Sequence, residues 1–421
     1  MITYSPPNHR LYLFTSFSTF FFFALTFAIP SGYSYGFALL LLASLFYFFT
    51  DTRNHLSVED KILTYLLLAF FLTAISAFFI HQNDVNTLDQ SSRYLLFIPI
   101  LFLILRVSVA PTAVWGGLTI GALSALTLAL WQRFSEGNLR PDGYMTSAIP
   151  FGNLSLMVGV LCIAGIAWSG TRTRYALHWR IVLYAGFLAG LYVSLVSGSR
   201  GGWLATPAVI TIFGAAFLRK GNLKRVMFNS LLILPLLLAL GMTMQDQIVE
   251  RFQAAATEMH EYAESNNSVT SVGVRLEAWR AAMVSIAEEP LLGWGYKDYT
   301  AHVREMAIKK EVNASIMALA NTHNNFLEVW LHQGLFGFLA FLALLTVPFW
   351  FFCKRLRSND PTVQAFALGG ACLLACFFIF SLTQVILGRN NGVIFFGLTL
   401  VIFWGGMRNA EQKSVDLGRS T

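Results

Sequence analysis

Long apolar runs, separated by short polar segments, make up most of this chain. About twelve of them approach 20 residues, the length at which an α-helix crosses the hydrocarbon core of a bilayer. They lie at residues 11–29, 33–50, 61–80, 94–105, 112–131, 150–168, 181–197, 203–218, 226–244, 326–352, 362–386 and 393–407. The run at 94–105 is short and needs its flanks, including Val107 to Ala110, to reach across. The pattern predicts about twelve transmembrane helices.

The composition excludes a soluble globular protein. Apolar residues occupy 56% of the 421 positions and charged residues only 12%, whereas ordinary soluble domains are about 25% charged. The predicted fold class is an all-α polytopic membrane protein, surrounded by membrane lipids. Four cysteines lie in or at the end of apolar runs, where we expect them to pack as small apolar residues: Cys162, Cys353, Cys372 and Cys376.

One long hydrophilic stretch interrupts the apolar runs. It divides the chain into nine spans at 1–244, a large loop at 245–325, three spans at 326–407 and a tail at 408–421. Two stretches of the loop are predicted to be helical, Gln247–Ala263 and Leu276–Ala287. The second carries an apolar stripe that suits it to lie on the membrane or against the bundle.

Topology explains the positive charge better than nucleic-acid binding does. The net charge is +7. If the N-terminus is cytoplasmic, short inside segments hold 17 of the 29 Lys and Arg residues and short outside segments hold 5. Because Lys and Arg concentrate in cytoplasmic loops, we expect both termini in the cytoplasm, the loop 245–325 on the exterior face, and no nucleic-acid partner.

Ionisable residues are scarce within the spans. The main examples are Glu328 and His332, in the span that begins near Phe326. Transport coupled to protons or sodium usually needs such groups inside the membrane. The ionisable residues gather instead where spans meet the outside, which favours an enzyme acting on a membrane-anchored substrate.

Four outward-facing arginines are candidates for binding an anion. Arg200 lies in the tight turn Ser197–Trp203 between two spans, where it either anchors a helix end or binds phosphate. Phosphate is favoured because an outside arginine opposes the charge bias and flanking glycines let a large anion approach the backbone. Arg275 opens an amphipathic stretch, Arg140 lies in a turn before the sixth span, and Arg389 lies between the last two spans. Each of these three is a weak signal alone.

His323 is the candidate general base. It lies in Asn321–Phe326, where Asn321 or Thr322 is expected to cap the helix of the tenth span. His323 would then occupy the first helical turn, where the helix dipole disfavours imidazolium and attracts anions. A histidine bonded to the backbone near the cap is the alternative. His332, nine residues later, is expected to face away and to make a packing or polar contact.

The sequence lacks motifs of metal and nucleotide enzymes. It contains no carboxylate cluster with metal-ligand spacing, no phosphate-binding loop of the nucleotide enzymes and no G-x-S-x-G string. We therefore expect no metal and no cofactor, because guanidinium groups bind a diphosphate directly.

Several strings in order along the chain resemble one family. They are Gly198–Trp203, Val274–Trp279 with Glu289–Gly295, and Thr322–Glu328 with Gly334–Gly337, preceded by Arg140, Gly143 and Phe151–Asn153. Together they resemble the bacterial O-antigen ligase and polymerase superfamily. The chain length, the span number and the single large loop are most similar to its O-antigen ligase family.

The resemblance implies a fold similar to the C-type membrane glycosyltransferases and a role in lipopolysaccharide biosynthesis. The reaction would move a glycan from undecaprenyl diphosphate to a sugar hydroxyl of lipid A–core, on the periplasmic face of the bacterial inner membrane. Arg200 and Arg275 would bind the diphosphate, with Arg140 and Arg389 as further contacts. His323 would accept the proton of the acceptor hydroxyl, and a single displacement would invert the anomeric carbon.

Two other functions stay open at this point. A repeat-unit polymerase, or another lipid-linked oligosaccharide transferase, needs the same arginines and base, so the motifs do not separate it from a ligase. A flippase or exporter of lipid-linked sugars belongs to another class, and it predicts translocation that survives the loss of His323.

Overall fold

The described residues are helical, as the apolar pattern predicts. The computed structural model describes residues 9–50, 56–172, 174–218, 245–265 and 268–419, and within these ranges it contains helices and no strand. The expected all-α class is therefore confirmed for the described part of the chain.

Eight described helices are long and apolar enough to cross a membrane. They are α3 (Val58–Ile80), α4 (Asp89–Val107) extended by η1 (Val85–Leu88), α5 (Pro111–Phe134), α6 (Ala148–Ala164) continued by α7 (Ile166–Ser169), α8 (Ala176–Ser197), α15 (Asn325–Cys353), α16 (Pro361–Thr383) and α17 (Asn390–Arg419). Three other predicted spans correspond to helices outside this set of eight, α1 (His9–Leu25), α2 (Gly32–Thr50) and α10 (Thr206–Phe217). The predicted span 226–244 lies outside the described residues, so the number twelve stays a prediction.

The weakest predicted span, 94–105, gains its length on one side. Helix α4 begins at Asp89 and ends at Val107, so the upstream flank supplies the missing residues. Ser108 leaves the helix with φ of 67°, and Pro111 starts α5. The expectation that residues up to Ala110 would extend this span is therefore wrong, because a left-handed residue and a proline end the helix.

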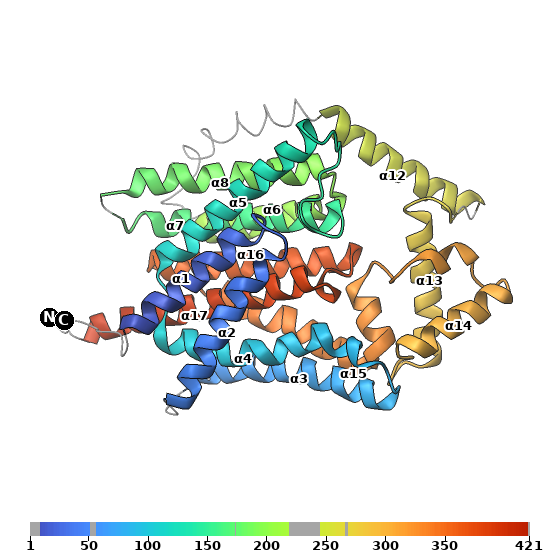
Figure 1. The fold of residues 1–421 in the computed structure, drawn as a ribbon, viewed down its shortest axis with the longest axis horizontal. Helices are drawn as coiled ribbons and strands as arrows, with labels where there is room; N and C mark the ends of the chain where they lie inside the picture. Colours follow the sequence, from blue (N-terminus) through green and yellow to red (C-terminus); the bar gives the residue numbers. More distant parts are fainter. Residues whose placement is uncertain (1–8, 51–55, 173, 219–244, 266–267, 420–421) are drawn as a thin grey trace.

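The bundle has two distinct ends. Helix α1 begins and α17 ends at one end, which we call the terminal end (Figure 1). Helices α12 (Gln245–Ser265), α13 (Gly273–Glu288) and α14 (Tyr296–Ile308) gather at the other, which we call the loop end. Two of these helices were predicted. Helix α14 was not, because charged residues interrupt its apolar ones.

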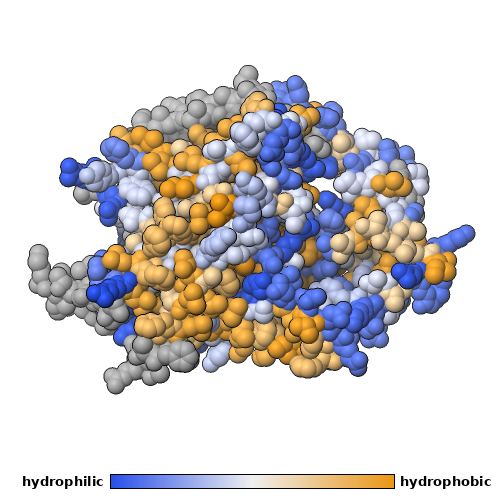
Figure 2. All heavy atoms as spheres, viewed as in Figure 1, coloured by the Kyte–Doolittle hydropathy of each residue, from blue (hydrophilic) through white to orange (hydrophobic). Residues whose placement is uncertain are grey.

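Apolar side chains hold the bundle together. The spans α6, α16 and α17 are the most buried of the eight, and phenylalanine rings pack between them, including Phe377 against Phe395 and Phe396. Hydrophobic residues cover much of the visible bundle surface, while hydrophilic ones gather toward the ends (Figure 2). All four cysteines are free and Cys162, Cys372 and Cys376 are buried, as expected of packing residues.

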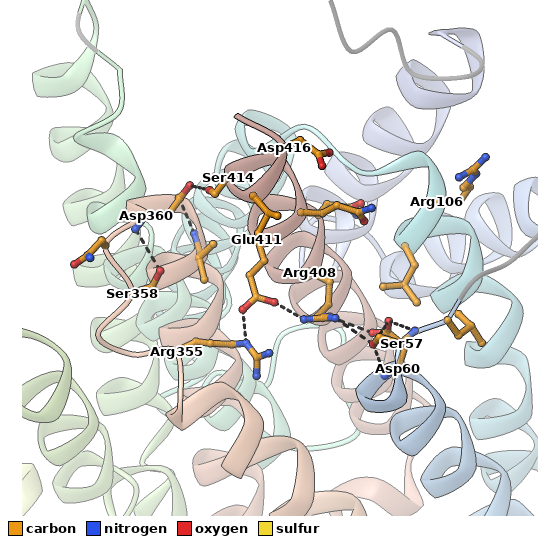
Figure 3. A pocket seen from close by; sticks show the side chains of 17 residues that line it. Ser57, Asp60, Arg106, Arg355, Ser358, Asp360, Arg408, Glu411, Ser414 and Asp416 are labelled. Atoms are coloured by element: carbon orange, nitrogen blue, oxygen red, sulfur yellow. Dashed lines mark hydrogen bonds and ion pairs between the residues drawn. The ribbon is translucent and has the colours of Figure 1, made fainter. Parts of the chain in front are cut away.

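Ion pairs tie the helices at the terminal end. Arg355 contacts Glu59 at 2.6 Å and Glu411 at 2.5 Å, which joins the end of α15 to α3 and α17. Arg408 of α17 pairs with Glu411 and with Asp60 (Figure 3). Asp60 also accepts a hydrogen bond from Trp404 Nε1. Asp60, Arg355, Arg408 and Glu411 line a cleft of about 1000 Å³. Arg355, just after α15, and Arg408 of α17 therefore each join helices through carboxylates.

Candidate functional site

The turn that carries Arg200 is packed against the start of α6. Helix α8 ends at Ser197, Gly198 takes a left-handed φ of 65°, and α9 (Arg200–Trp203) follows. A Cβ atom at Gly152 would lie 2.0 Å from Ser197 Oγ, so only glycine allows this approach. The Ser199 hydroxyl also donates a hydrogen bond to Asn153 Oδ1. The string Phe151–Asn153 thus fixes the position of the turn.

The glycines after Arg200 pack against helices. A Cβ atom at Gly201 would lie 2.3 Å from Thr383 Oγ1 of α16, and one at Gly202 would lie 2.8 Å from Asn153 Oδ1 of α6. The expectation that both glycines leave the backbone open to a large anion is therefore wrong for Gly202. Their absent side chains let α9 fit between α6 and α16.

Three of the predicted arginines line one small cavity. Arg140 comes from the loop between α5 and α6, Arg200 from α9, and Arg275 from the first turn of α13. The cavity has a volume of about 80 Å³, and Ile149, Gly198, Gly201, Ser271 and Thr383 complete its lining. Among the described residues that line it there is no carboxylate. Its size and charge suit a phosphate group.

The electrostatics of the cavity favour an anion. Burial lowers the pKa of Arg275, and the charges of Arg200 and Arg140 lower it further, against a smaller opposite effect of Glu258. Guanidinium groups stay protonated in proteins. The lowered pKa of Arg275 therefore indicates that its positive charge is destabilised by burial and by the neighbouring arginines. An oxyanion in the cavity would relieve that repulsion, and the planar fork of arginine matches its oxygen atoms.

His323 precedes helix α15 rather than lying in its first turn. Asn324 is the N-cap, because its Oδ1 accepts hydrogen bonds from Phe326 N at 2.9 Å and Leu327 N at 3.2 Å. The expectation that Asn321 or Thr322 caps this helix is wrong. The Thr322 hydroxyl instead donates to Glu328 Oε2 at 2.8 Å and accepts the Asn324 N–H at 3.3 Å. His323 itself takes the uncommon left-handed φ of 53°.

The imidazole of His323 is directed by a glutamine from α16. Nδ1 lies 2.6 Å from Gln384 Oε1. Burial lowers the pKa of His323, and the charges of Arg275 and Arg389 lower it further, while Gln384 and Glu328 act in the opposite direction. The ring is therefore kept neutral, as a general base must be.

A buried network supports the loop that holds His323. Glu328 accepts hydrogen bonds from Thr322 N at 3.0 Å and Thr322 Oγ1 at 2.8 Å. His332 Nε2 lies 3.5 Å from Glu328 Oε1, and the Tyr296 ring stacks on His332 with centroids 3.8 Å apart. Trp279 Nε1 donates to Thr322 O at 2.9 Å. His332 makes the predicted polar contact.

Arg389 lies near the base but does not line the cavity. It follows η3 (Ile386–Gly388), and its Nη1 donates to the Thr146 hydroxyl. Burial lowers its pKa. Lys297 of α14 pairs with Asp84 at 3.0 Å, and Lys309, just after α14, pairs with Glu305 at 2.7 Å on the exposed surface.

Sequence reasoning missed Gln384 and Thr383. Both stand at the end of the predicted span 362–386, where Ser381, Thr383 and Gln384 interrupt an apolar run. That cluster of polar residues was the available signal. Thr383 lines the arginine cavity and Gln384 contacts the imidazole, so this end of α16 connects the two halves of the site.

Comparison with known proteins agrees with these features. A protein of Haemophilus influenzae (strain ATCC 51907 / DSM 11121 / KW20 / Rd), described as an uncharacterized protein, is 27% identical over 383 residues, which cover 91% of this chain and 95% of that protein. Residues 184–342 match the family model described as O-Antigen ligase. The matched segment contains Arg200, Arg275 and His323. The predicted resemblance is thus confirmed, since this chain is similar to the O-antigen ligase family model over residues 184–342.

Proposed function

We propose that this protein is an O-antigen ligase of the bacterial inner membrane. It would transfer a glycan from undecaprenyl diphosphate to a sugar hydroxyl of lipid A–core, with its loop end facing the periplasm and both termini in the cytoplasm. The family match over 184–342 supports the reaction class, and the Lys and Arg distribution supports the orientation. Twelve spans and a C-type glycosyltransferase fold belong to the same proposal.

The observation that carries the proposal is the cavity that Arg140, Arg200 and Arg275 share, close to His323. The donor carries a diphosphate on its anomeric carbon, and this leaving group needs its growing negative charge stabilised. Three guanidinium groups supply that stabilisation in a partly buried site, where electrostatic effects on the transition state are largest. No metal ion is required for this role.

The proposed reaction is a single displacement. The acceptor hydroxyl attacks the anomeric carbon, the bond from that carbon to the phosphate oxygen breaks, and undecaprenyl diphosphate leaves. The hydroxyl proton passes to Nε2 of His323, since Nδ1 faces Gln384. Positioned base catalysis of this kind contributes about 10²–10⁴-fold. Arg389, beside the base, would assist in holding the diphosphate.

A reconstituted transfer assay tests the proposal. The purified protein should attach lipid-linked glycan to lipid A–core, with inversion and in the presence of chelator. His323→Ala should bind the donor and transfer none of it. Chain growth without lipid A–core would identify a repeat-unit polymerase instead, and translocation by His323→Ala would identify an exporter. Retention of anomeric configuration would rule out the single displacement.

A further inference from the structure

Gln384 is held firmly at the end of α16. It is the C-cap of the helix, with extended backbone at φ of −157° and ψ of 145°, and its N–H donates to Phe380 O at 3.0 Å. Its side chain is only 1% exposed. The preceding residue, Thr383, touches the arginine cavity. The amide oxygen of Gln384 is therefore fixed relative to the cavity and not free to follow a moving ring.

The loop on the other side of the contact is equally constrained. His323 N–H donates to Asn321 Oδ1 at 3.0 Å, which stabilises the left-handed backbone of His323. Thr322 is held by Glu328 and Trp279. The two partners of the 2.6 Å contact between Nδ1 and Oε1 thus come from separately anchored segments 61 residues apart.

The contact selects one form of the neutral ring. A neutral imidazole carries a single N–H, and the hydrogen bond made by one nitrogen decides which nitrogen holds the proton. An amide oxygen only accepts hydrogen bonds. Nδ1 must therefore carry the proton when it faces Oε1, and Nε2 keeps the lone pair.

We infer that Gln384 is a positioning residue that fixes His323 in the Nδ1–H tautomer and leaves Nε2 as the proton acceptor. This inference rests on the proposed function and names the device that aims its base. The charged groups that act on the ring come from three segments: Arg275 of α13, Arg389 after η3 and Glu328 of α15. Gln384 also contacts the ring but carries no charge. It therefore orients the imidazole without an ion pair that would favour imidazolium.

Two substitutions separate orientation from packing. Gln384→Met removes the acceptor at similar side-chain length, and Gln384→Glu keeps an acceptor but adds negative charge. Gln384→Met should lower kcat by about 10- to 100-fold with little change in donor KM. In another enzyme, holding the catalytic histidine in the wrong tautomer lowers kcat roughly 10⁴-fold. The loss expected here is smaller, because Gln384→Met leaves both tautomers of His323 accessible.

The pH profiles of the two variants should move in opposite directions. The Gln384 hydrogen bond raises the pKa of His323, so its loss in Gln384→Met should move the acid limb of activity to lower pH. A carboxylate stabilises imidazolium, so Gln384→Glu should move it to higher pH while keeping near-normal kcat above that limb. Gln364→Met, at the opposite end of the same helix, is the matched control and should change neither.

Chemical modification of His323 provides a readout independent of transfer. Diethyl pyrocarbonate acylates the neutral imidazole, and peptide mass mapping across pH gives the midpoint for His323 in each variant. Opposite shifts of this midpoint support the inference. Equal losses of kcat in both variants without any shift would overturn it and indicate packing alone. Shifted midpoints combined with full transfer by His323→Ala would instead overturn the proposed function while leaving the contact intact.

Discussion

The two ends of the bundle use arginine in opposite ways. At the terminal end, Arg355 contacts two carboxylates and Arg408 contacts three, and these pairs join α3, α17 and the segment after α15. At the loop end, Arg140, Arg200 and Arg275 meet around a cavity whose described lining contains no carboxylate. The first arrangement is complete within the chain. The second surrounds an open volume of about 80 Å³, where we propose that an anion binds.

The difference is one of electrostatic energy. A partly buried arginine beside a carboxylate recovers much of its lost hydration through the ion pair. Arginines that face one another in a buried site recover less and repel one another, as the lowered pKa of Arg275 indicates. Arginines gathered around a cavity whose described lining contains no carboxylate therefore indicate a candidate anion site more directly than an arginine count does.

The largest expected effect is the loss of a cavity arginine. Arg275→Ala should lower kcat/KM for glycan transfer by about 10²–10³-fold, because one preorganised charge on the leaving diphosphate is removed. Arg275→Lys should recover little of the loss, since lysine lacks the bidentate fork. Transfer by the purified variants measures both. Arg172→Ala, an exposed arginine at the terminal end, is the control, and an equal effect of that control would break the comparison.

Breaking the terminal-end network should affect stability instead. Arg408→Ala leaves Asp60 and Glu411 without this partner and should lower the free energy of unfolding by about 1–2 kcal/mol. This is less than the 3–5 kcal/mol of fully buried pairs, because the Arg408 side chain is 22% exposed. Thermal unfolding in detergent measures the loss. Transfer per folded molecule should stay at the wild-type level, and a folded but inactive Arg408→Ala would contradict the division between the two ends.

The pH dependence of transfer should reveal the charge of the loop end. The base acts when neutral, and the pKa of His323 is lowered by burial and by nearby arginines. Activity should therefore persist below pH 6.5, about the ordinary pKa of histidine. Removing one of those charges with Arg275→Gln should raise the pKa and move the acid limb upward. A limb that does not move would place Arg275 and His323 in separate sites.

The smallest expected effect belongs to an exposed pair. Lys309 and Glu305 contact at 2.7 Å on the surface of α14, where solvent screens the interaction. Lys309→Ala should change neither the melting temperature nor transfer to lipid A–core. Weakened transfer would instead extend the functional surface from the cavity onto α14.

Local patterns predicted the elements but not their junctions. Apolar runs located the described spans, because a helix must bury its backbone polar groups and present apolar side chains to lipid. The same patterns misplaced the cap of α15, since Asn321, Thr322 and Asn324 are all capable N-caps. In the folded loop the Thr322 hydroxyl donates to Glu328, one turn into the helix, and Asn324 caps the helix instead. The sequence does not show which of the three residues takes the cap position.

The sequence by itself determined the helical membrane class, the large loop and the residue types of a candidate phosphate site, because apolar length and charge sign are local properties. Only the tertiary structure decided which charges have partners. Arg355 meets Glu59 across 296 positions of the chain, and His323 meets Gln384 across 61. Such contacts depend on how the helices pack against one another. The spacing of apolar and polar residues along the sequence does not predict which distant residues this packing brings together.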